Sequence, residues 1–406
     1  MRKNQINVFI ITWLGYAALY LTRKNFGVVK VDLHQELGLT LSDLGLIETC
    51  FLVVYAAGQF TSGFVGDLMG AKRLIALGLI GSAACSFGFV YGQEPLFFAL
   101  FFAMNGLFQS TGWANNVKAL EPWFLEEQRG KVLSWWGTNQ QVGGLFGTVF
   151  AVYLAARLGW QSAFVVPSAI VLVIGLIVAS FLAEPKVSSQ QEIIKIASVK
   201  ARTNYKIMLG NPVLWSLSMA YFGLKLIRYS LLFWLPFYLH ETLKIPKEDA
   251  GYLSVAFEIG GILGSLMLGW LSDRYFLHSR ERLMLPIFLL LALSLYIYRD
   301  YSSASMTVNF LLLALIGFFV FGPDTFISGV CAQDIGGKHL TGSAAGFING
   351  VGSVGAIFQG LITAYVSTHW GWPSLFTFFV ALALFSSVML VPLWRNTATA
   401  TEKPLC

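Results

Sequence analysis

Apolar stretches of about 20 residues recur along the whole chain and constrain its fold more than any other feature. A helix of that length crosses the hydrocarbon core of a lipid bilayer, which is ~30 Å thick. About twelve such stretches can be marked, at residues 6–32, 42–66, 72–91, 96–118, 130–156, 163–183, 211–240, 250–271, 283–299, 305–331, 340–367 and 373–394. Because 56% of the 406 residues are hydrophobic and 12% are charged, a soluble globular protein is excluded. The sequence predicts an all-α membrane protein with twelve transmembrane helices.

One long polar stretch, rich in Lys, Ser and Gln, separates the first six spans from the last six. We therefore predict an N-terminal six-helix bundle at residues 1–183, a cytoplasmic linker at 184–210 and a C-terminal six-helix bundle at 211–406. The first apolar run has no small-residue cleavage site after it, which favours a retained span over a signal peptide.

Most lysines and arginines fall on the side of the predicted bundle that carries both termini. Lys30, Arg157, Lys244, Lys247 and Arg299 lie on the other side. Because basic loops remain in the cytoplasm, we predict an integral multi-pass protein of the bacterial inner membrane with both termini cytoplasmic. The formal charge of +6 then reflects these loops, and no nucleic-acid partner is expected.

The two predicted halves repeat each other. Arg23 precedes Asp67 by 44 residues, and Arg228 precedes Asp273 by 45 residues. The pattern indicates duplication of a six-helix unit and predicts two pseudo-symmetric bundles. In transporters with such repeats, the substrate binds near the membrane midplane where the repeats meet.

Each half carries an arginine inside its first apolar span, at Arg23 and Arg228. An arginine at that depth costs at least ~2.5–3.5 kcal/mol, so it faces a cavity or a partner. The planar guanidinium suits bidentate binding of phosphate or carboxylate oxygens, and two of them suit a dianion. We predict an anion site between the halves. The alternative is that each arginine neutralises a nearby buried acid.

Further candidate residues follow from helical spacing. Lys225 lies one turn before Arg228, and Tyr16 and Tyr20 lie on the turns before Arg23. Trp136, on the fifth span, is the tryptophan that we place nearest the proposed site; the other tryptophans favour packing and the membrane interface.

Buried acids leave two roles open. Glu258 could pair with Arg228 or Lys225 and release it when substrate binds, whereas Asp324 could carry a proton or balance Lys225. The loop residues Asp67 and Arg73, with Asp273 and Arg274 in the second half, predict a conformational latch rather than a substrate contact.

Motifs for other chemistries are missing. The chain has no Gly-rich loop ending in Lys-Ser/Thr, no His-Glu-x-x-His and no Gly-x-Ser-x-Gly, so we predict neither an enzyme nor an ATP-driven pump. Its four cysteines and five histidines have no paired spacing, and we expect no metal site and no cofactor.

Several motifs together resemble a known family. They are Gly15-Tyr16, Tyr20, Arg23-Lys24-Asn25-Phe26, the loop at Asp67, Gly112-Trp113, Val142-Gly143-Gly144, Arg228-Tyr229, Trp234, Glu258, Gly322-Pro323 and the run from Gly342 to Phe347. Over residues 6–394 the chain resembles the organophosphate:phosphate antiporter family of the major facilitator superfamily. That family includes glycerol-3-phosphate and hexose-phosphate transporters, a related phosphate-ester sensor and eukaryotic sugar-phosphate exchangers.

The resemblance implies the major facilitator fold, alternating access, and exchange of cytoplasmic phosphate for an external phosphate ester. It implies that Arg23 and Arg228 clamp the phosphoryl group, with Lys24, Tyr16, Tyr20 and Trp136 at or beside the site.

The chain also departs from the pattern. Where the glycerol-3-phosphate transporter has a lysine, a histidine and a tyrosine, this chain has Gln59, Gln140 and Phe321. Lys225 and Asp324 are additional charges. We therefore count Gln140 and Lys225 among the candidate substrate contacts and leave the organic part of the substrate open.

The resulting hypothesis is a monomeric secondary transporter. It imports a small phosphorylated organic anion in exchange for inorganic phosphate. Two alternatives stay open. One is a membrane sensor that binds a phosphate ester and signals to a partner. The other is a proton symporter of a carboxylate or zwitterion that uses Asp324.

Overall fold

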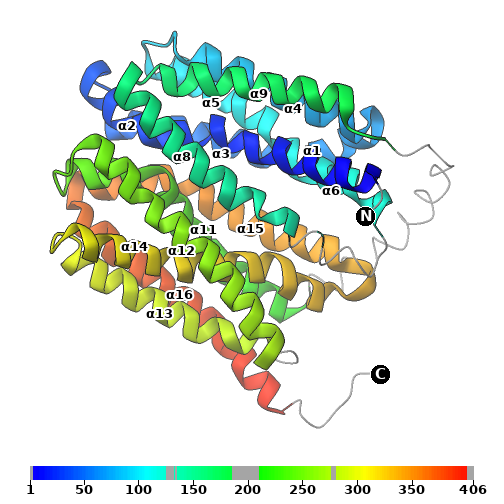
Figure 1. Cartoon of the computed structure of the whole chain (residues 1–406). Coiled ribbons are helices and arrows are strands. Elements are labelled where there is room, and N and C mark those ends of the chain that lie inside the picture. Colours follow the sequence, from blue (N-terminus) through cyan, green and yellow to red (C-terminus); the bar gives the residue numbers. More distant parts are fainter. Residues whose placement is uncertain (1–2, 125–131, 133–134, 185–209, 276–279, 400–406) are drawn as a thin grey trace. The chain divides into compact units, whose positions relative to one another are not determined.

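The structure is a computed structural model that describes residues 3–124, 132, 135–184, 210–275 and 280–399. All regular structure in these ranges is helical (Figure 1). The helices before residue 184 are α1 (Lys3–Leu19), η1 (Tyr20–Thr22), α2 (Lys24–Leu37), α3 (Leu41–Met69), α4 (Ala71–Phe89), α5 (Pro95–Ser110), α6 (Gly112–Leu120), η2 (Glu121–Trp123), α8 (Asn139–Leu158) and α9 (Ser162–Phe181). The later helices are α11 (Pro212–Glu241), α12 (Lys247–Tyr275), α13 (Arg280–Tyr301), α14 (Met306–Thr325), the π-helix η3 (Phe326–Cys331), α15 (Ala332–Trp370) and α16 (Trp372–Thr399).

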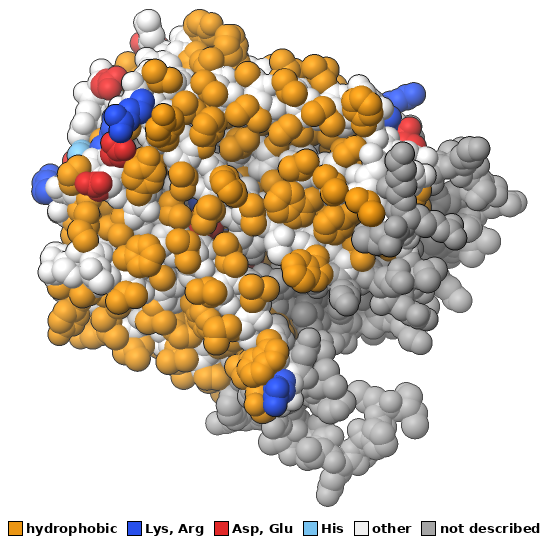
Figure 2. Space-filling view, viewed as in Figure 1, with side chains coloured by type: hydrophobic (Ala, Val, Ile, Leu, Met, Phe, Trp, Pro, Cys, Tyr) orange, Lys and Arg blue, Asp and Glu red, His pale blue; other side chains and the backbone are white. Residues whose placement is uncertain are grey.

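Ten helices within the described ranges are long and apolar enough to cross a membrane. Two predicted spans are outside these ten. The span at 211–240 corresponds to α11, and the span at 96–118 is divided into α5 and α6, because the helix is interrupted at Thr111. The face shown in Figure 2 carries hydrophobic side chains over most of its area, with the charged side chains near its margins. Exposed apolar residues include Leu14, Phe146, Phe181, Leu266 and Leu293. Such a surface is stable against lipid rather than water, and the predicted all-α membrane fold is confirmed.

The first span was predicted as one continuous helix at residues 6–32, and the structure differs from this prediction. The span is interrupted by the 3-10 turn η1 and continues to Leu37. The interruption is stabilised by side chains: the Thr22 hydroxyl donates to the Leu19 carbonyl at 3.2 Å, and the Asn105 amide donates to the Thr22 carbonyl at 2.8 Å. Gly38 then ends α2 with φ +68°, in the left-handed region that glycine tolerates.

This longer span changes the position of Lys30. Lys30 was expected among the basic residues at the side opposite the termini, but it lies in α2 and its side chain is fully buried. The span from 340 to 367 was also predicted too short, because α15 begins at Ala332.

The chain forms two compact units whose bounds do not follow the predicted halves. Unit 1 comprises Met1–Lys186, Leu231–Val255 and Gly360–Thr368, and unit 2 comprises Val187–Ser230, Ala256–Gln359 and His369–Cys406. In unit 1, α3 packs along α5 and α4 packs along α9; in unit 2, α13 packs along α16. Most of the predicted linker, residues 185–209, lies outside the described residues, so the six-plus-six division stays a prediction.

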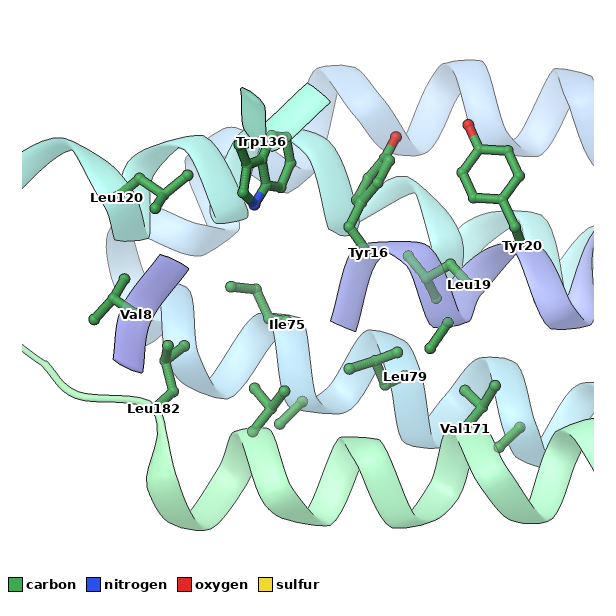
Figure 3. Close-up of a cluster of buried hydrophobic side chains, with 14 of the residues drawn as sticks. Val8, Tyr16, Leu19, Tyr20, Ile75, Leu79, Leu120, Trp136, Val171 and Leu182 are labelled. Carbon is green, nitrogen blue, oxygen red and sulfur yellow. The ribbon is translucent and has the colours of Figure 1, made fainter. Parts of the chain in front are cut away.

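The core of unit 1 is a cluster of buried side chains around α1 (Figure 3). Tyr16 and Tyr20 lie on one side of this segment, and Trp136 lies beside Tyr16. Leu79 of α4 and Val171 of α9 pack on the other side. Because these side chains interlock at close-packed density, the segment that leads to Arg23 is held firmly by apolar burial.

Candidate anion-binding site

Arg23 lies at the junction between η1 and α2, where it is the N-cap residue of α2 and is 4% exposed. Its Nε donates a hydrogen bond to the side-chain oxygen of Gln109 at 2.7 Å. Its guanidinium carbon lies 5.0 Å from the ring centroid of Tyr20 and 4.8 Å from that of Tyr55. The break in the first span therefore places a cation among aromatic faces, which attract it electrostatically.

Gln109 is held by a buried polar network between helices. Its amide nitrogen lies within hydrogen-bond distance of Thr22 Oγ1 (3.2 Å) and of Asn105 Oδ1 (3.1 Å). Ser82 on α4 adds a 2.6 Å hydrogen bond to the same Asn105 oxygen. These contacts turn the Gln109 carbonyl toward Arg23. Sequence reasoning missed this residue, although Asn105 and Gln109 stand one turn apart in the otherwise apolar α5.

The other candidates from the first half lie near one another in unit 1. The Tyr16 ring is 5.4 Å from the Trp136 ring and 6.1 Å from the Tyr20 ring, between centroids. The Tyr20 hydroxyl donates to Gln140 Oε1 at 3.4 Å. Lys24, the first residue of α2, is 5% exposed.

Trp136 is fully buried, and its indole nitrogen donates to Thr12 Oγ1 at 3.1 Å. The ring therefore contacts core residues on all sides, including Tyr16. Its geometry suits a residue that supports the position of Tyr16.

In unit 2, Arg228 on α11 forms an ion pair with Asp324 on α14. The Tyr221 hydroxyl donates to the other carboxylate oxygen of Asp324 at 3.0 Å. The guanidinium carbon of Arg228 lies 4.5 Å from the ring centroid of Phe321, the aromatic residue one turn before Asp324. Arg228 is thus paired with Asp324, whereas the sequence suggested Glu258 as the acid for Arg228 and Lys225 as the cation for Asp324.

Lys225 extends the same network toward α15. Its ammonium donates to Asn349 Oδ1 at 3.3 Å and to Ser353 Oγ at 3.4 Å, and Tyr221 reaches the same Asn349 oxygen at 3.4 Å. Sequence reasoning missed all three of these partners: Tyr221 stands one turn before Lys225, and Asn349 and Ser353 stand one turn apart on α15.

Glu258 is buried on α12, with 3% of its surface exposed. Of the predicted latch residues, Arg73 is exposed at the start of α4 and Arg274 is exposed at the end of α12, 5.4 Å from the Trp270 ring centroid. The side chains of Asp67 and Asp273 lie outside the described set. The latch therefore stays a prediction.

Each unit thus holds one arginine in a buried polar and aromatic setting that can exchange a protein acceptor for an anion. In unit 1 the protein acceptor is an amide, and in unit 2 it is a carboxylate. A guanidinium has five N–H donors in a planar fork, a geometry that suits the oxygens of a phosphoryl group.

The chain is similar to known transport proteins over nearly its whole length. The family model of the Major Facilitator Superfamily matches residues 12–360. A "Probable hexose phosphate transport protein" of Chlamydia trachomatis serovar D is 29% identical, over 98% of this chain and 93% of its own length. "Putative glycerol-3-phosphate transporter 2" of Arabidopsis thaliana is 30% identical, over 97% of this chain and 87% of its own. "Membrane sensor protein UhpC" of Escherichia coli K12 is 28% identical, over 98% and 93%.

Solved structures support the fold. A bacterial homologue of the human lysosomal transporter Spinster, in an inward-facing and occupied conformation, superposes with a TM-score of 0.80 at 12% identity over 100% of both chains. A D-xylose–proton symporter superposes with a TM-score of 0.74 at 13% identity, over 95% of this chain and 97% of its own. The predicted fold and the predicted family resemblance are confirmed: this chain is a multi-pass membrane transporter that belongs to the Major Facilitator Superfamily.

Proposed function

We propose that the protein imports a small phosphorylated organic anion across the bacterial inner membrane in exchange for inorganic phosphate, as a monomer with both termini cytoplasmic. The observation that carries the proposal is the pair of repeat-related arginines, Arg23 and Arg228, each buried in its own unit. The names of the hexose phosphate and glycerol-3-phosphate transporters support the same class of cargo.

The chemistry around Arg23 favours a phosphoryl group. A phosphate monoester approaches a dianion near neutral pH, and a guanidinium binds two of its oxygens at once. Arg23 also caps the 14-residue helix α2, whose N-terminal dipole adds positive potential at the same point. In this proposal Lys24, Tyr16, Tyr20 and Gln140 border the phosphoryl group on the unit 1 side, with Trp136 behind Tyr16.

On the unit 2 side, the substrate anion replaces Asp324 as the partner of Arg228. The displaced carboxylate stays near Tyr221, and through Tyr221 and Asn349 it is connected to the ammonium of Lys225. Inorganic phosphate and a phosphate ester both carry the phosphoryl oxygens that replace the Asp324 carboxylate at Arg228. Either can therefore occupy the site during the return step, which is the requirement for exchange by alternating access.

The test is exchange of phosphate by the purified protein in proteoliposomes. Uptake of labelled phosphate should saturate and should rise when phosphate is also present inside. Arg23→Lys and Arg228→Lys keep the charge but lose the bidentate fork, and each should abolish exchange. Arg299→Lys, at a partly exposed site near the end of α13, is the matched control and should exchange like the wild type. Normal exchange in both site variants would refute the arginine clamp.

A second candidate is a sensor, because a membrane sensor protein is among the relatives of similar identity. A sensor would bind phosphate esters but would not move them. Thermal-shift titration with phosphate and its esters, combined with the flux assay, separates the two functions. Stabilisation by ligand without exchange would favour the sensor.

A third candidate, proton symport, is suggested by the Arg228–Asp324 pair, because substrate binding can release a carboxylate that takes up a proton. Asp324→Asn should then lose uptake driven by a pH gradient while it retains exchange. A variant that keeps both activities would exclude Asp324 as the proton carrier.

A further inference from the structure

A buried ion pair in unit 1 has no role in the proposed anion site. Lys30 on α2 and Glu48 on α3 form this pair, and both side chains have 0% exposure. Trp234 on α11 covers it. The Lys30 ammonium lies 3.3 Å from the centroid of the indole ring, and the indole nitrogen donates to the second Glu48 oxygen at 2.8 Å. One side chain of α11 therefore contacts both charges.

The surrounding contacts show how tightly this region is closed. A Cβ atom on Gly27 would lie 3.1 Å from the carbonyl oxygen of Phe233 on α11. A Cβ atom on Gly45 would lie 2.6 Å from the carbonyl oxygen of Gly360 on α15. Small residues let the helix backbones approach directly. We call this contact of α2 and α3 with the unit 1 segments of α11, α12 and α15 the seam.

A second ion pair marks the rim of the seam. Asp32 on α2 pairs with Lys247 at the start of α12. The Asp32 side chain is buried, with 2% of its surface exposed, whereas the Lys247 side chain is 35% exposed. The two pairs differ in their access to water. The Lys247 side chain of the rim pair reaches solvent while the seam is closed, whereas neither side chain of the Lys30–Glu48 pair does.

Packing alone does not explain a fully buried ion pair, because burying charges is costly. The cost of taking two charges out of water can exceed the gain from their attraction, and apolar residues of the same volume often pack at least as well. The cost is recovered when the charges are hydrated again. A pair placed under Trp234 therefore raises the free energy of the closed seam relative to the open one, and it opposes the apolar contacts that hold the seam shut.

We propose that Lys30, Glu48 and Trp234 form a gate that sets the equilibrium between the closed and open states of the seam. The ion pair keeps the seam able to open. The indole of Trp234 contacts both charges and fixes their positions when the seam is closed. The bundles of this fold alternate access by separating at one end and then the other. The gate residues then determine how often this end opens, and they do so without touching the substrate.

The experiment measures opening directly and needs no substrate, so its outcome is independent of the proposed function. Ser367 lies on the same face of α15 as Gly360 and Ala364, seven residues after Gly360, and is 8% exposed. Ser367→Cys is introduced into a chain in which the four native cysteines are replaced by alanine. The rate of maleimide labelling in detergent then reports how often the seam opens.

The proposal predicts opposite effects for single and double variants. Glu48→Gln and Lys30→Met each leave one charge in the seam without its counterion, and labelling should accelerate at least about tenfold, which corresponds to ~1.4 kcal/mol. Lys30→Met combined with Glu48→Leu removes both charges and should slow labelling at least about tenfold. A loss of packing could not produce this reversal of sign.

Two controls accompany these variants. Arg299→Gln removes an exposed cation on α13 and should label like the parent chain. Size-exclusion chromatography and the thermal unfolding midpoint confirm that each variant is folded, and if a single variant fails to fold, the double variant decides alone. Labelling of the double variant at the parent rate, or faster, would overturn the proposal.

Discussion

Arg228 on α11 is paired with Asp324 on α14, and both side chains are about nine-tenths buried. Tyr221 completes the contacts of the carboxylate with a 3.0 Å hydrogen bond. The arginine that the repeat marks for anion binding thus has an internal counterion. Any anion that binds Arg228 must compete with this carboxylate, and the strength of that competition can be measured.

Asp324→Asn should bind inorganic phosphate more tightly, by about tenfold. The amide can still accept the hydrogen bond of Tyr221, but it no longer neutralises Arg228 or repels an approaching phosphate. Titration calorimetry of the purified variant checks this expectation. Asp300→Asn, at an exposed position beside Arg299, is the matched control and should leave affinity unchanged. Weaker binding in Asp324→Asn would show instead that the carboxylate helps to hold the ligand.

Gln109→Glu should abolish phosphate binding. The substitution keeps the shape of the side chain and places a carboxylate where Arg23 now receives an amide oxygen at 2.7 Å. A buried carboxylate forms a stronger, charge-assisted contact with the guanidinium and would occupy it permanently. Binding is measured by thermal shift with phosphate, with Gln93→Glu at an exposed site between α4 and α5 as the control. Unchanged phosphate binding would place the anion away from Arg23.

Trp136→Phe tests whether this tryptophan supports the site or touches the ligand. The substitution removes the hydrogen bond to Thr12 and part of the ring that packs on Tyr16. We expect a loss of ~1–3 kcal/mol in the free energy of unfolding and little change in phosphate affinity. Chemical unfolding and phosphate titration measure the two quantities separately. A large loss of affinity at unchanged stability would make Trp136 a ligand contact.

Much of the fold could be predicted because it follows from hydrophobicity along the chain. Runs of apolar residues indicate where helices cross the membrane, and the high cost of a charge in such a run draws attention to Arg23 and Arg228. Helical spacing also indicated that Tyr16 and Tyr20 lie near each other, since residues four apart share a face, and their ring centroids are 6.1 Å apart.

Contacts between helices could not be predicted in the same way, because the sequence does not specify which faces meet. The hydrogen bond from Arg23 to Gln109 joins residues 86 positions apart. The break at η1 depends on the Asn105 amide reaching the Thr22 carbonyl from another helix. Lys30 was assigned to the side opposite the termini because it lies near the end of the first predicted span, at residues 6–32. Its partner Glu48 became apparent only when α2 and α3 were seen together.

Gly45→Ala should open the seam by a steric route that leaves every charge in place. A Cβ atom at this position would lie 2.6 Å from the Gly360 carbonyl oxygen, a distance that real Cβ contacts essentially never show, so one helix must move. Labelling of the thiol introduced by Ser367→Cys should therefore accelerate. Gly137→Ala is the matched control, because a Cβ atom there would meet no atom within 4 Å.

Comparing Gly45→Ala with Gly137→Ala also distinguishes opening of the seam from a general loss of stability. Alanine favours a helix over glycine by ~1 kcal/mol, so the control variant should be at least as stable as the parent and should label at the parent rate. If the gate works as proposed, combining Gly45→Ala with Lys30→Met and Glu48→Leu should return labelling toward the parent rate, because the steric and electrostatic changes act on the same equilibrium in opposite directions. Independent rates in the combined variant would mean that Gly45 and the Lys30–Glu48 pair control different motions.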